Sequence, residues 1–310
     1  MDTRRLGAQG PELSVLGLGC NNFGMKLDAE QTKAVVETAM EVGITHFDTA
    51  EMYGGGKSEE FLGAALGTRR DEVVLATKYL PRSEEPFRPG DLSRRITDAA
   101  DGSLRRLGTD RIDVFYQHYP DPEAPLDELL DAFESLITSG KVLHAAISNV
   151  DAAQITATTA AAQARDGFPL RGVQVEWNLL ARGVEDTIVP AAHAAGLGVV
   201  PYFPLASGLL TGKYSGRNDF PEGSRLATLP WFAQAATPEN LAKVDSLSAV
   251  ARRHERTIIE LAFGWLLAQP DVTSVIAGAT TPEQVNANVT SIGWSLTASE
   301  LAEIDQALAS

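Results

Sequence analysis

The sequence of 310 residues contains a single cysteine, Cys20. A disulfide within the chain is therefore excluded, and the cysteine usage gives no sign of an oxidising compartment. The N-terminal stretch MDTRRLGAQG lacks the apolar core of a signal peptide. No uninterrupted apolar run reaches the roughly 18–20 residues that a transmembrane helix needs. We therefore expect a cytoplasmic protein that does not enter a membrane.

Basic residues are also scarce. The chain has 26 Lys and Arg residues against 41 Asp and Glu residues, a net charge of −15. Nucleic acids and anionic lipid surfaces are bound through basic patches, so neither is an expected partner. A few local basic residues would still suffice to hold a phosphate-bearing cofactor. With 44% hydrophobic residues, the chain has ample material for a large core.

Short apolar runs, each followed by a helical pattern, recur along the chain. The runs are rich in Val and Ile and rarely alternate with polar residues, which is typical of strands buried on both faces. They end at Cys20, Asp48, Lys78, His118, Asn149, Asn178, Tyr202 and Ala279. Helical patterns cover about 29–42, 58–67, 91–107, 125–139, 151–164, 186–196, 238–254, 257–268, 282 onward and 298–308. A βα unit of about 30 residues repeated eight times predicts a (β/α)8 TIM barrel.

Two shorter features complete the predicted architecture. Two runs flanking Gln9-Gly10-Pro11 predict a β-hairpin near the N-terminus. The alternative fold, a doubly wound open sheet, calls for a glycine-rich dinucleotide fingerprint. The early Gly17-Leu18-Gly19 lacks the third glycine and the helix directly behind it. Because no linker, charge block or low-complexity segment interrupts the chain, we expect one barrel domain over residues 1–310.

The stretch THFDTAEMYGGGKSEEFLG at 45–63 organises the predicted site. Asp48 ends an apolar run, and Tyr53 lies in the following loop. Lys78 and His118 end the next two runs, and in a barrel all such ends meet on one face. Each residue also has an ordinary explanation, such as a solvated lysine or a structural histidine. Their convergence on one rim favours a shared site.

These four residue types suit the reduction of a carbonyl group by hydride transfer. Hydride delivery leaves an alkoxide, to which Tyr53 can give a proton. A cation at Lys78 would lower the phenol pKa, and Asp48 would pair with the lysine. His118 would orient the carbonyl oxygen through a hydrogen bond. A metal-dependent barrel hydrolase is the rival hypothesis, but the five histidines do not have the spacing of metal ligands, so no metal is expected.

Long, correctly ordered motifs make the chain resemble the aldo-keto reductase family nearly end to end, in its bacterial and potassium-channel β-subunit-like branch. The motifs are DTAEMYGGGKSEEFLG at 48–63, ATK at 76–78, IDVFYQHYPDPEAPLDE at 112–128, ISN at 147–149, VQVEWNLLAR at 173–182, YFPLASGLLTGKY at 202–214 and IAGATTPEQVNANV at 276–289. The resemblance implies a (β/α)8 barrel closed at its bottom by the hairpin. It also implies reduction of aldehydes and ketones with NADPH and without metal.

The resemblance further implies the residues that bind the cofactor. Ser148, Asn149 and Gln174 would hold the nicotinamide carboxamide, and Tyr202 would stack on the ring. The remaining expected contacts are Gly19, Cys20, Asn21, Asp48, Leu205, Ser207, Lys213, Arg225, Gly278, Thr280, Gln284 and Asn288. Gly278 and Gln284 replace a Lys and an Arg that grip the 2′-phosphate in the aldose-reductase branch. Lys213 and Arg225 are therefore the expected phosphate contacts, with NADPH preferred and NADH as an alternative.

The substrate and the direction of the reaction are left open by the sequence. We expect a small carbonyl compound. Aromatic residues on or near the predicted rim loops are its candidate contacts, with the alternative, for at least half of them, that they pack helices onto the barrel: Phe23, Tyr79, Phe87, Tyr119, Trp177 and Trp231. Two alternatives belong to the same fold: an NADPH-binding regulatory or sensor subunit, and a dehydrogenase of alcohols or sugars. His118 favours an enzyme, because regulatory relatives commonly lack it. The oligomeric state is not predicted.

Overall fold

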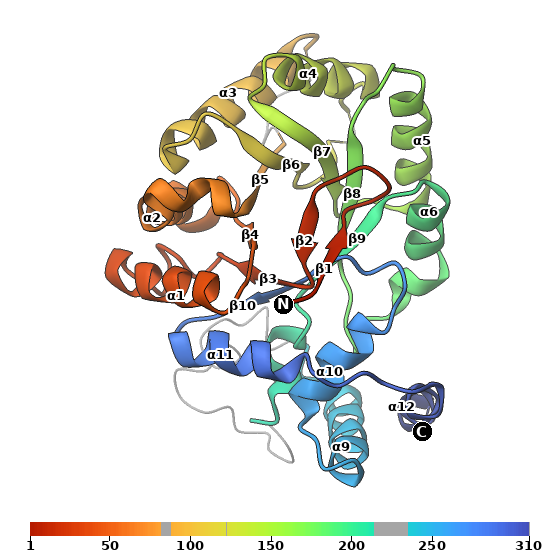
Figure 1. Cartoon of the computed structure of the whole chain (residues 1–310). Helices are drawn as coiled ribbons and strands as arrows, with labels where there is room; N and C mark the ends of the chain where they lie inside the picture. The colour runs from red at the N-terminus through yellow and green to blue at the C-terminus, as the bar shows by residue number, and fades with distance from the viewer. Residues whose placement is uncertain (82–87, 122, 214–234, 310) are drawn as a thin grey trace.

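The chain folds into a closed barrel of eight parallel strands surrounded by helices, as the computed structural model shows for residues 1–81, 88–121, 123–213 and 235–309 (Figure 1). The strand order is β10-β3-β4-β5-β6-β7-β8-β9. The barrel strands are β3 (Leu16–Gly19), β4 (His46–Asp48), β5 (Val74–Tyr79), β6 (Ile112–Gln117), β7 (Val142–Ser148), β8 (Leu170–Glu176), β9 (Gly198–Tyr202) and β10 (Val275–Gly278). The predicted (β/α)8 fold is confirmed.

The α-helices lie close to the ranges that the sequence predicted for them. They are α1 (Ala29–Glu41), α2 (Lys57–Leu66), α3 (Asp91–Leu107), α4 (Leu126–Thr138), α5 (Ala152–Gln163), α6 (Ile188–Ala194), α9 (Pro238–Arg253), α10 (Ile258–Leu267), α11 (Pro282–Ser291) and α12 (Ala298–Ala309). Short 3₁₀ helices are η1 (Tyr53–Gly56), η2 (Gly67–Glu72), η3 (Gly183–Asp186) and η4 (Ala206–Thr211). Within the described ranges, no helix is both long and apolar enough to span a bilayer.

Thr297 and Glu300, three residues apart, form a capping box at the start of helix α12. The Glu300 carboxylate accepts from the Thr297 backbone N–H at 2.6 Å, and the Glu300 N–H donates to Thr297 Oγ1 at 3.3 Å. Each side chain thereby satisfies a backbone donor that the first helical turn leaves free.

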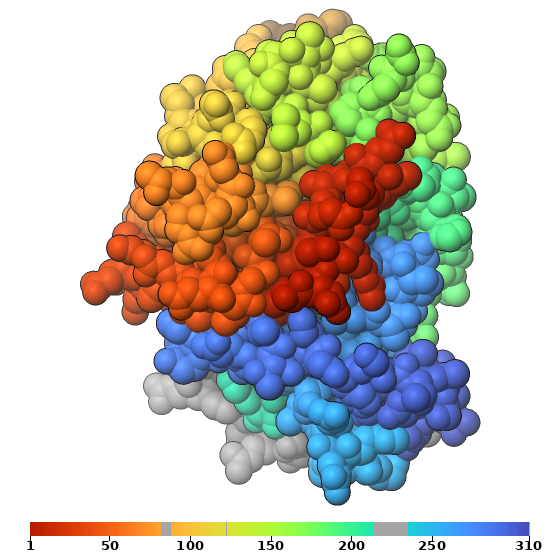
Figure 2. Space-filling model, viewed as in Figure 1, coloured from red at the N-terminus to blue at the C-terminus, as the bar shows by residue number. Residues whose placement is uncertain are grey.

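The N-terminal hairpin closes one end of the barrel. Strands β1 (Thr3–Arg5) and β2 (Glu12–Ser14) pair antiparallel, and the hairpin lies across the face of the barrel in Figures 1 and 2. Leu6 and Leu13 are fully buried in the cluster that fills the barrel interior. Gly172 near the start of β8 and Gly198 at the start of β9 leave room for the Leu6 side chain. A Cβ at these positions would come within 2.8 and 2.9 Å of Leu6 Cδ1. The opposite end of the barrel is left for a site.

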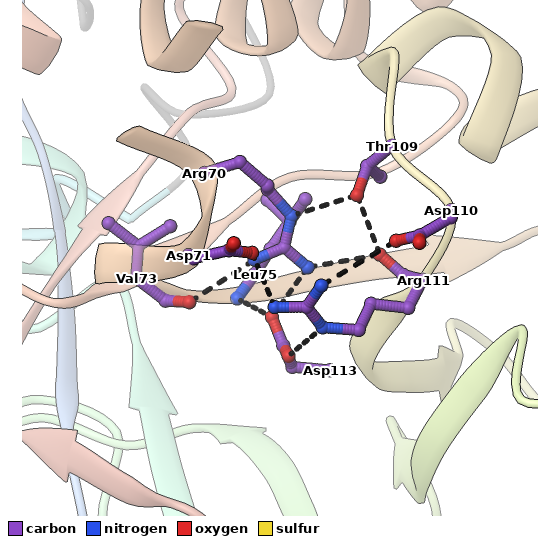
Figure 3. A network of polar contacts seen from close by, with 8 residues as sticks. All are labelled: Arg70, Asp71, Val73, Leu75, Thr109, Asp110, Arg111 and Asp113. Atoms are coloured by element: carbon purple, nitrogen blue, oxygen red, sulfur yellow. Dashed lines mark hydrogen bonds and ion pairs between the residues drawn. The ribbon is translucent and has the colours of Figure 1, made fainter. Parts of the chain in front are cut away.

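A buried polar network fastens the amino ends of β5 and β6 to η2 (Figure 3). The Arg70 guanidinium donates to Asp113 Oδ2 at 2.7 Å, to the Val73 and Arg111 carbonyls and to Thr109 Oγ1. Asp113 Oδ2 also accepts from the Leu75 backbone N–H at 2.8 Å. Because both charges are paired and hydrogen-bonded, the network can remain buried.

Candidate active site

The predicted catalytic residues lie together at the carboxyl ends of β4, β5 and β6. Asp48 is the last residue of β4, Lys78 lies near the end of β5, and His118 directly follows β6. The Lys78 side chain is completely buried, and its Nζ donates to Asp48 Oδ1 at 2.5 Å and to the Thr49 carbonyl at 2.8 Å. The fold therefore holds an ion pair beneath the rim of the barrel.

Tyr53 is brought over this ion pair by a tight turn. It begins η1, in which Gly54 and Gly55 have left-handed φ values of 59° and 65°. A Cβ at Gly54 would come within 2.9 Å of the Phe23 carbonyl, so glycine lets the turn pack against the neighbouring loop. Lys78 Nζ lies 5.3 Å from the Tyr53 ring centroid. The Tyr53 and His118 rings meet edge to face, with centroids 5.9 Å apart.

Both rings are neutral near neutral pH. The pKa of Tyr53 is raised well above its usual value, first by burial and then by the Asp48 carboxylate. The charge of Lys78, which we expected to lower this pKa, does not bring it below its usual value, because burial is the larger effect. Burial, followed by the Lys78 charge, lowers the pKa of His118 to about 3. Tyr53 therefore keeps a proton to donate.

The expected carboxamide-binding residues form one connected group beside this pair. Gln174 Nε2 donates to Asp48 Oδ2 at 2.9 Å, and the Gln174 backbone carbonyl accepts from Ser148 Oγ at 3.0 Å. Asn149 has a left-handed φ of 56°, and its Nδ2 donates to the His118 carbonyl at 2.8 Å. The Tyr202 hydroxyl donates to Asn149 Oδ1 at 2.7 Å. Three amide or hydroxyl side chains and an aromatic ring are thus linked to the Asp48 carboxylate.

The end of β3 contributes a close backbone approach next to Asp48. The Cys20 backbone N–H donates to the Asp48 carbonyl at 2.9 Å, and Asn21, half-buried, follows. Gly19 pairs with Gly278 of β10, and a Cβ at Gly19 would come within 2.9 Å of Ile276 Cγ2. The Cys20 thiol is buried, and burial raises its pKa. This part of the rim is lined by backbone and small side chains.

The other expected cofactor residues lie after β9 and β10. Leu205 and Ser207 are half-buried around the start of η4, and Lys213 is exposed just beyond its end. Arg225 lies outside the described residues. Thr280 donates from its backbone N–H and Oγ1 to Gln284 Oε1, at 2.8 and 3.0 Å. Gly278 is exposed, whereas Asn288 is buried on α11.

Three of the six aromatic residues expected near the substrate pack in the core. Phe23 and Tyr79 are fully buried, and Tyr79 packs on Phe115 and Phe133. Trp177 is also buried, edge-on to Trp265. Tyr119 is 44% exposed and stacks on the His118 ring at 4.8 Å. Phe87 and Trp231 lie outside the described residues.

A buried glutamate near the site was missed by sequence reasoning. Glu59, in the first turn of α2, accepts from Thr77 Oγ1 and from Arg106 Nε, each at 2.6 Å. Thr77 precedes Lys78 in β5, so these hydrogen bonds join β5 to α2, the helix that follows the Tyr53 turn. Acidic residues are common in a first helical turn because the helix dipole favours them, and only the tertiary contacts distinguish the buried Glu59 from its exposed neighbour Glu60.

Comparison with known proteins agrees with this fold. A model of the Aldo/keto reductase family matches residues 15–309. The chain is 34% identical to a "Probable voltage-gated potassium channel subunit beta" of Oryza sativa subsp. japonica, over 93% of this chain and 90% of the relative. It is 33% identical to the "L-glyceraldehyde 3-phosphate reductase" of Escherichia coli O157:H7, over 100% and 93%. It is 30% identical to "Probable aldo-keto reductase 1" of Glycine max, over 98% and 88%.

The chain therefore belongs to the aldo/keto reductase family, an oxidoreductase family whose members generally use nicotinamide cofactors.

Proposed function

We propose that this protein reduces aldehydes or ketones to alcohols with a reduced nicotinamide cofactor, and that Tyr53 is the general acid. The observation that carries the proposal is the convergence of a neutral phenol, a neutral imidazole and a buried lysine–carboxylate pair. Lys78 Nζ lies 5.3 Å from the Tyr53 ring centroid and 2.5 Å from Asp48 Oδ1. Tyr53 holds its proton until charge develops on the carbonyl oxygen.

The residues around the phenol have separable roles in this chemistry. The neutral His118 ring can donate one hydrogen bond, which suits it to polarise and orient a carbonyl oxygen. Lys78 supplies positive charge near the oxygen that becomes negative, and Asp48 fixes the lysine. Because these groups are buried before the reaction begins, little reorganisation is needed as charge forms.

The residues present fit a nicotinamide cofactor. The linked amide and hydroxyl groups of Gln174, Ser148 and Asn149 offer both donors and acceptors, as a carboxamide requires. Tyr202 offers an aromatic ring beside them. Gly19 and Gly278 keep the adjoining rim free of side chains. When bound, the reduced cofactor supplies the hydride.

We further propose a moderate preference for NADPH over NADH. The segment at 278–288 offers no cation, so Lys213 and Arg225 would supply the positive charge that a 2′-phosphate needs. Replacing Arg225 by Ala should weaken NADPH binding by roughly 1–3 kcal/mol, the range for a hydrogen bond to a charged group, and barely change NADH binding. Dissociation constants for both cofactors test this. Equal losses would show that Arg225 does not contact the 2′-phosphate.

The central experiment measures cofactor oxidation across a panel of aldehydes, ketones, keto-sugars and quinones. Tyr53→Phe should bind cofactor normally but lose about 10²–10⁴-fold in kcat, the usual contribution of general acid catalysis. Near-normal kcat in this variant would remove Tyr53 from its assigned role. Activity should survive exhaustive EDTA treatment, and activity restored by zinc after chelation would favour a metal-dependent hydrolase.

The second candidate is a regulatory subunit that binds NADPH, favoured by the relatives named as channel β subunits. The discriminating observation is His118, which is buried beside Tyr53 and has its Nδ1 without a hydrogen-bond partner in the described part of the chain. Tight cofactor binding without turnover on any carbonyl of the panel would favour the regulatory subunit. A measurable kcat that falls in His118→Ala would favour the enzyme.

A further inference from the structure

The ammonium group of Lys78 is enclosed by two oxygen acceptors and two aromatic rings. The side chain has no exposed surface, so water cannot solvate its charge. Two of its three N–H groups are used by Asp48 Oδ1 and the Thr49 carbonyl. Nζ lies 5.3 Å from the Tyr53 ring centroid and 5.9 Å from that of Tyr116, and both distances allow a cation–π attraction. The Tyr53 ring is already part of the candidate site, whereas the Tyr116 ring is not.

The strand register places Tyr116 directly beside Lys78 inside the barrel. The two residues are Cα partners across β5 and β6, so their side chains lie on the same face of the sheet. On its other side Tyr116 pairs with Ala146, whose small side chain leaves room for the phenol ring. Tyr116 is fully buried. Its ring therefore lies inside the barrel, next to the ion pair of Lys78 and Asp48.

The hydroxyl of Tyr116 does not explain why an aromatic residue stands here. Within the described residues, its Oη makes no hydrogen bond of normal geometry, although a buried tyrosine hydroxyl usually has a partner. The pKa of the phenol is raised, first by burial and then by the Asp48 carboxylate, so the hydroxyl stays neutral. Two features distinguish Tyr116 from an aliphatic core residue: an interaction of its hydroxyl with the Gln174 side chain, and the contact between its ring and the Lys78 charge. Tyr116→Phe removes the first feature and keeps the second.

We propose that Tyr116 is a positioning residue, whose ring stabilises the Lys78 ammonium and holds it beside Tyr53. This inference rests on the proposed function, since it assigns a purpose to the lysine in carbonyl reduction. The ring replaces water on a side of the ammonium that no oxygen covers. Without it, the lysine would retain Asp48 but lose part of the constraint that sets its position relative to Tyr53.

The first test changes the electrons of the ring and keeps its shape. Tyr116→Phe preserves the ring and should keep kcat within about threefold of the original protein. Incorporating 3,4,5-trifluorophenylalanine at position 116 withdraws charge from the ring face at nearly the same volume. We expect kcat to fall roughly tenfold relative to Tyr116→Phe, with the cofactor Kd unchanged. Equal kcat values for the two rings would overturn the proposal.

Phe115→Leu is the matched control for general damage to the core. Phe115 is the preceding residue of β6, is fully buried, and packs on Tyr79 and Phe133 rather than on the lysine. We expect this variant to be less stable while kcat per folded molecule is unchanged. If Phe115→Leu lowered kcat as much as the trifluorinated ring does, the effect at position 116 would be ordinary core packing.

A second measurement does not depend on activity and so separates this inference from the proposed function. Unfolding equilibrium constants are measured for the phenylalanine and trifluorophenylalanine proteins, with Lys78 intact and in the Lys78→Met background. We expect fluorination to favour unfolding roughly tenfold when Lys78 is present and to have little effect without it. Equal effects in both backgrounds would refute the ring–ammonium contact. No carbonyl reduction by the original protein would instead refute only the function.

Discussion

Gln174 and Asp48, 126 positions apart in the chain, are joined by a hydrogen bond of 2.9 Å from Nε2 to Oδ2. The other oxygen of the same carboxylate accepts from Lys78 at 2.5 Å. Asp48 therefore links a residue proposed to bind the cofactor carboxamide to the lysine proposed to act in catalysis. Because both contacts are buried, a change on one side should be felt on the other.

Gln174→Leu should therefore impair both binding and turnover. The variant removes a donor to the buried carboxylate and a partner for the carboxamide. We expect the cofactor Kd to rise roughly tenfold and kcat to fall by a similar factor. Ser148→Ala is the control for binding alone: it removes another proposed carboxamide contact and a hydrogen bond to the Gln174 backbone carbonyl but leaves the Asp48 contact in place, so we expect Kd to rise with kcat nearly unchanged. A Gln174→Leu variant that changed Kd alone would show that the two functions are independent.

Lys78→Met should be more harmful to activity than Asp48→Asn. The first variant removes the only positive charge of the pair, and we expect kcat to fall by at least about 100-fold. The second loosens the lysine without removing it. Steady-state kcat and unfolding by denaturant should be measured together, since breaking a buried ion pair typically costs about 3–5 kcal/mol of stability. A larger kcat loss in Asp48→Asn would reverse the assigned roles.

The sequence predicted the barrel well because its signals are local and repeated. Apolar runs and amphipathic helices recurred at a regular interval, and Asp48 marks both the predicted and the observed end of its strand. The convergence of Lys78 and His118 with Asp48 followed from topology alone, since parallel barrel strands end on one face.

What sequence reasoning missed depends on which way a side chain faces and what it meets there. Tyr79 and Trp177 were expected near the substrate, but their places in the strand and loop turn them towards the helices. Glu59 looked like an ordinary acidic first turn, and Tyr116 like a core residue. The direction of the Tyr53 pKa depended first on how deeply the phenol is buried, which a motif does not reveal.

The pH dependence of carbonyl reduction should be nearly flat around neutrality. His118, with a pKa of about 3, is neutral throughout this range, and Tyr53, with its raised pKa, remains protonated. We expect kcat at saturating substrate to change less than about twofold between about pH 5.5 and pH 9. An activity that rose or fell through a pKa near 6.5 would show that a histidine with an ordinary pKa controls the reaction.

Acid should destabilise the fold through His46. This imidazole is fully buried inside the barrel with Nδ1 bonded to Ser274 Oγ at 2.9 Å, and burial lowers its pKa from 6.5 to about 4. As the pH falls, the unfolded chain takes up the proton first, so stability present above pH 6.5 is lost progressively towards pH 4. The loss from this group is about 3 kcal/mol. The free energy of unfolding in urea should be measured against pH for the original protein and for His46→Asn. We expect it to depend less steeply on pH in the variant, and parallel curves would contradict this.

The polar network at the closed end of the barrel should govern stability without touching catalysis. Arg70 and Asp113 side chains are only 10% and 12% exposed, and Arg70 also donates to two backbone carbonyls. Arg70→Met would leave the buried Asp113 carboxylate with only its longer ion pair to Arg111, 3.8 Å from Arg111 Nε to Asp113 Oδ1, and we expect a loss of about 3 kcal/mol in the free energy of unfolding. Its neighbour Arg69 provides the control, because it pairs with Glu72 in solvent and Arg69→Met should have little effect.

The kcat of the folded Arg70→Met protein should equal that of the original, since the network lies at the amino ends of β5 and β6, opposite Tyr53. A large fall in kcat with no change in stability would mean that this end of the barrel communicates with the site.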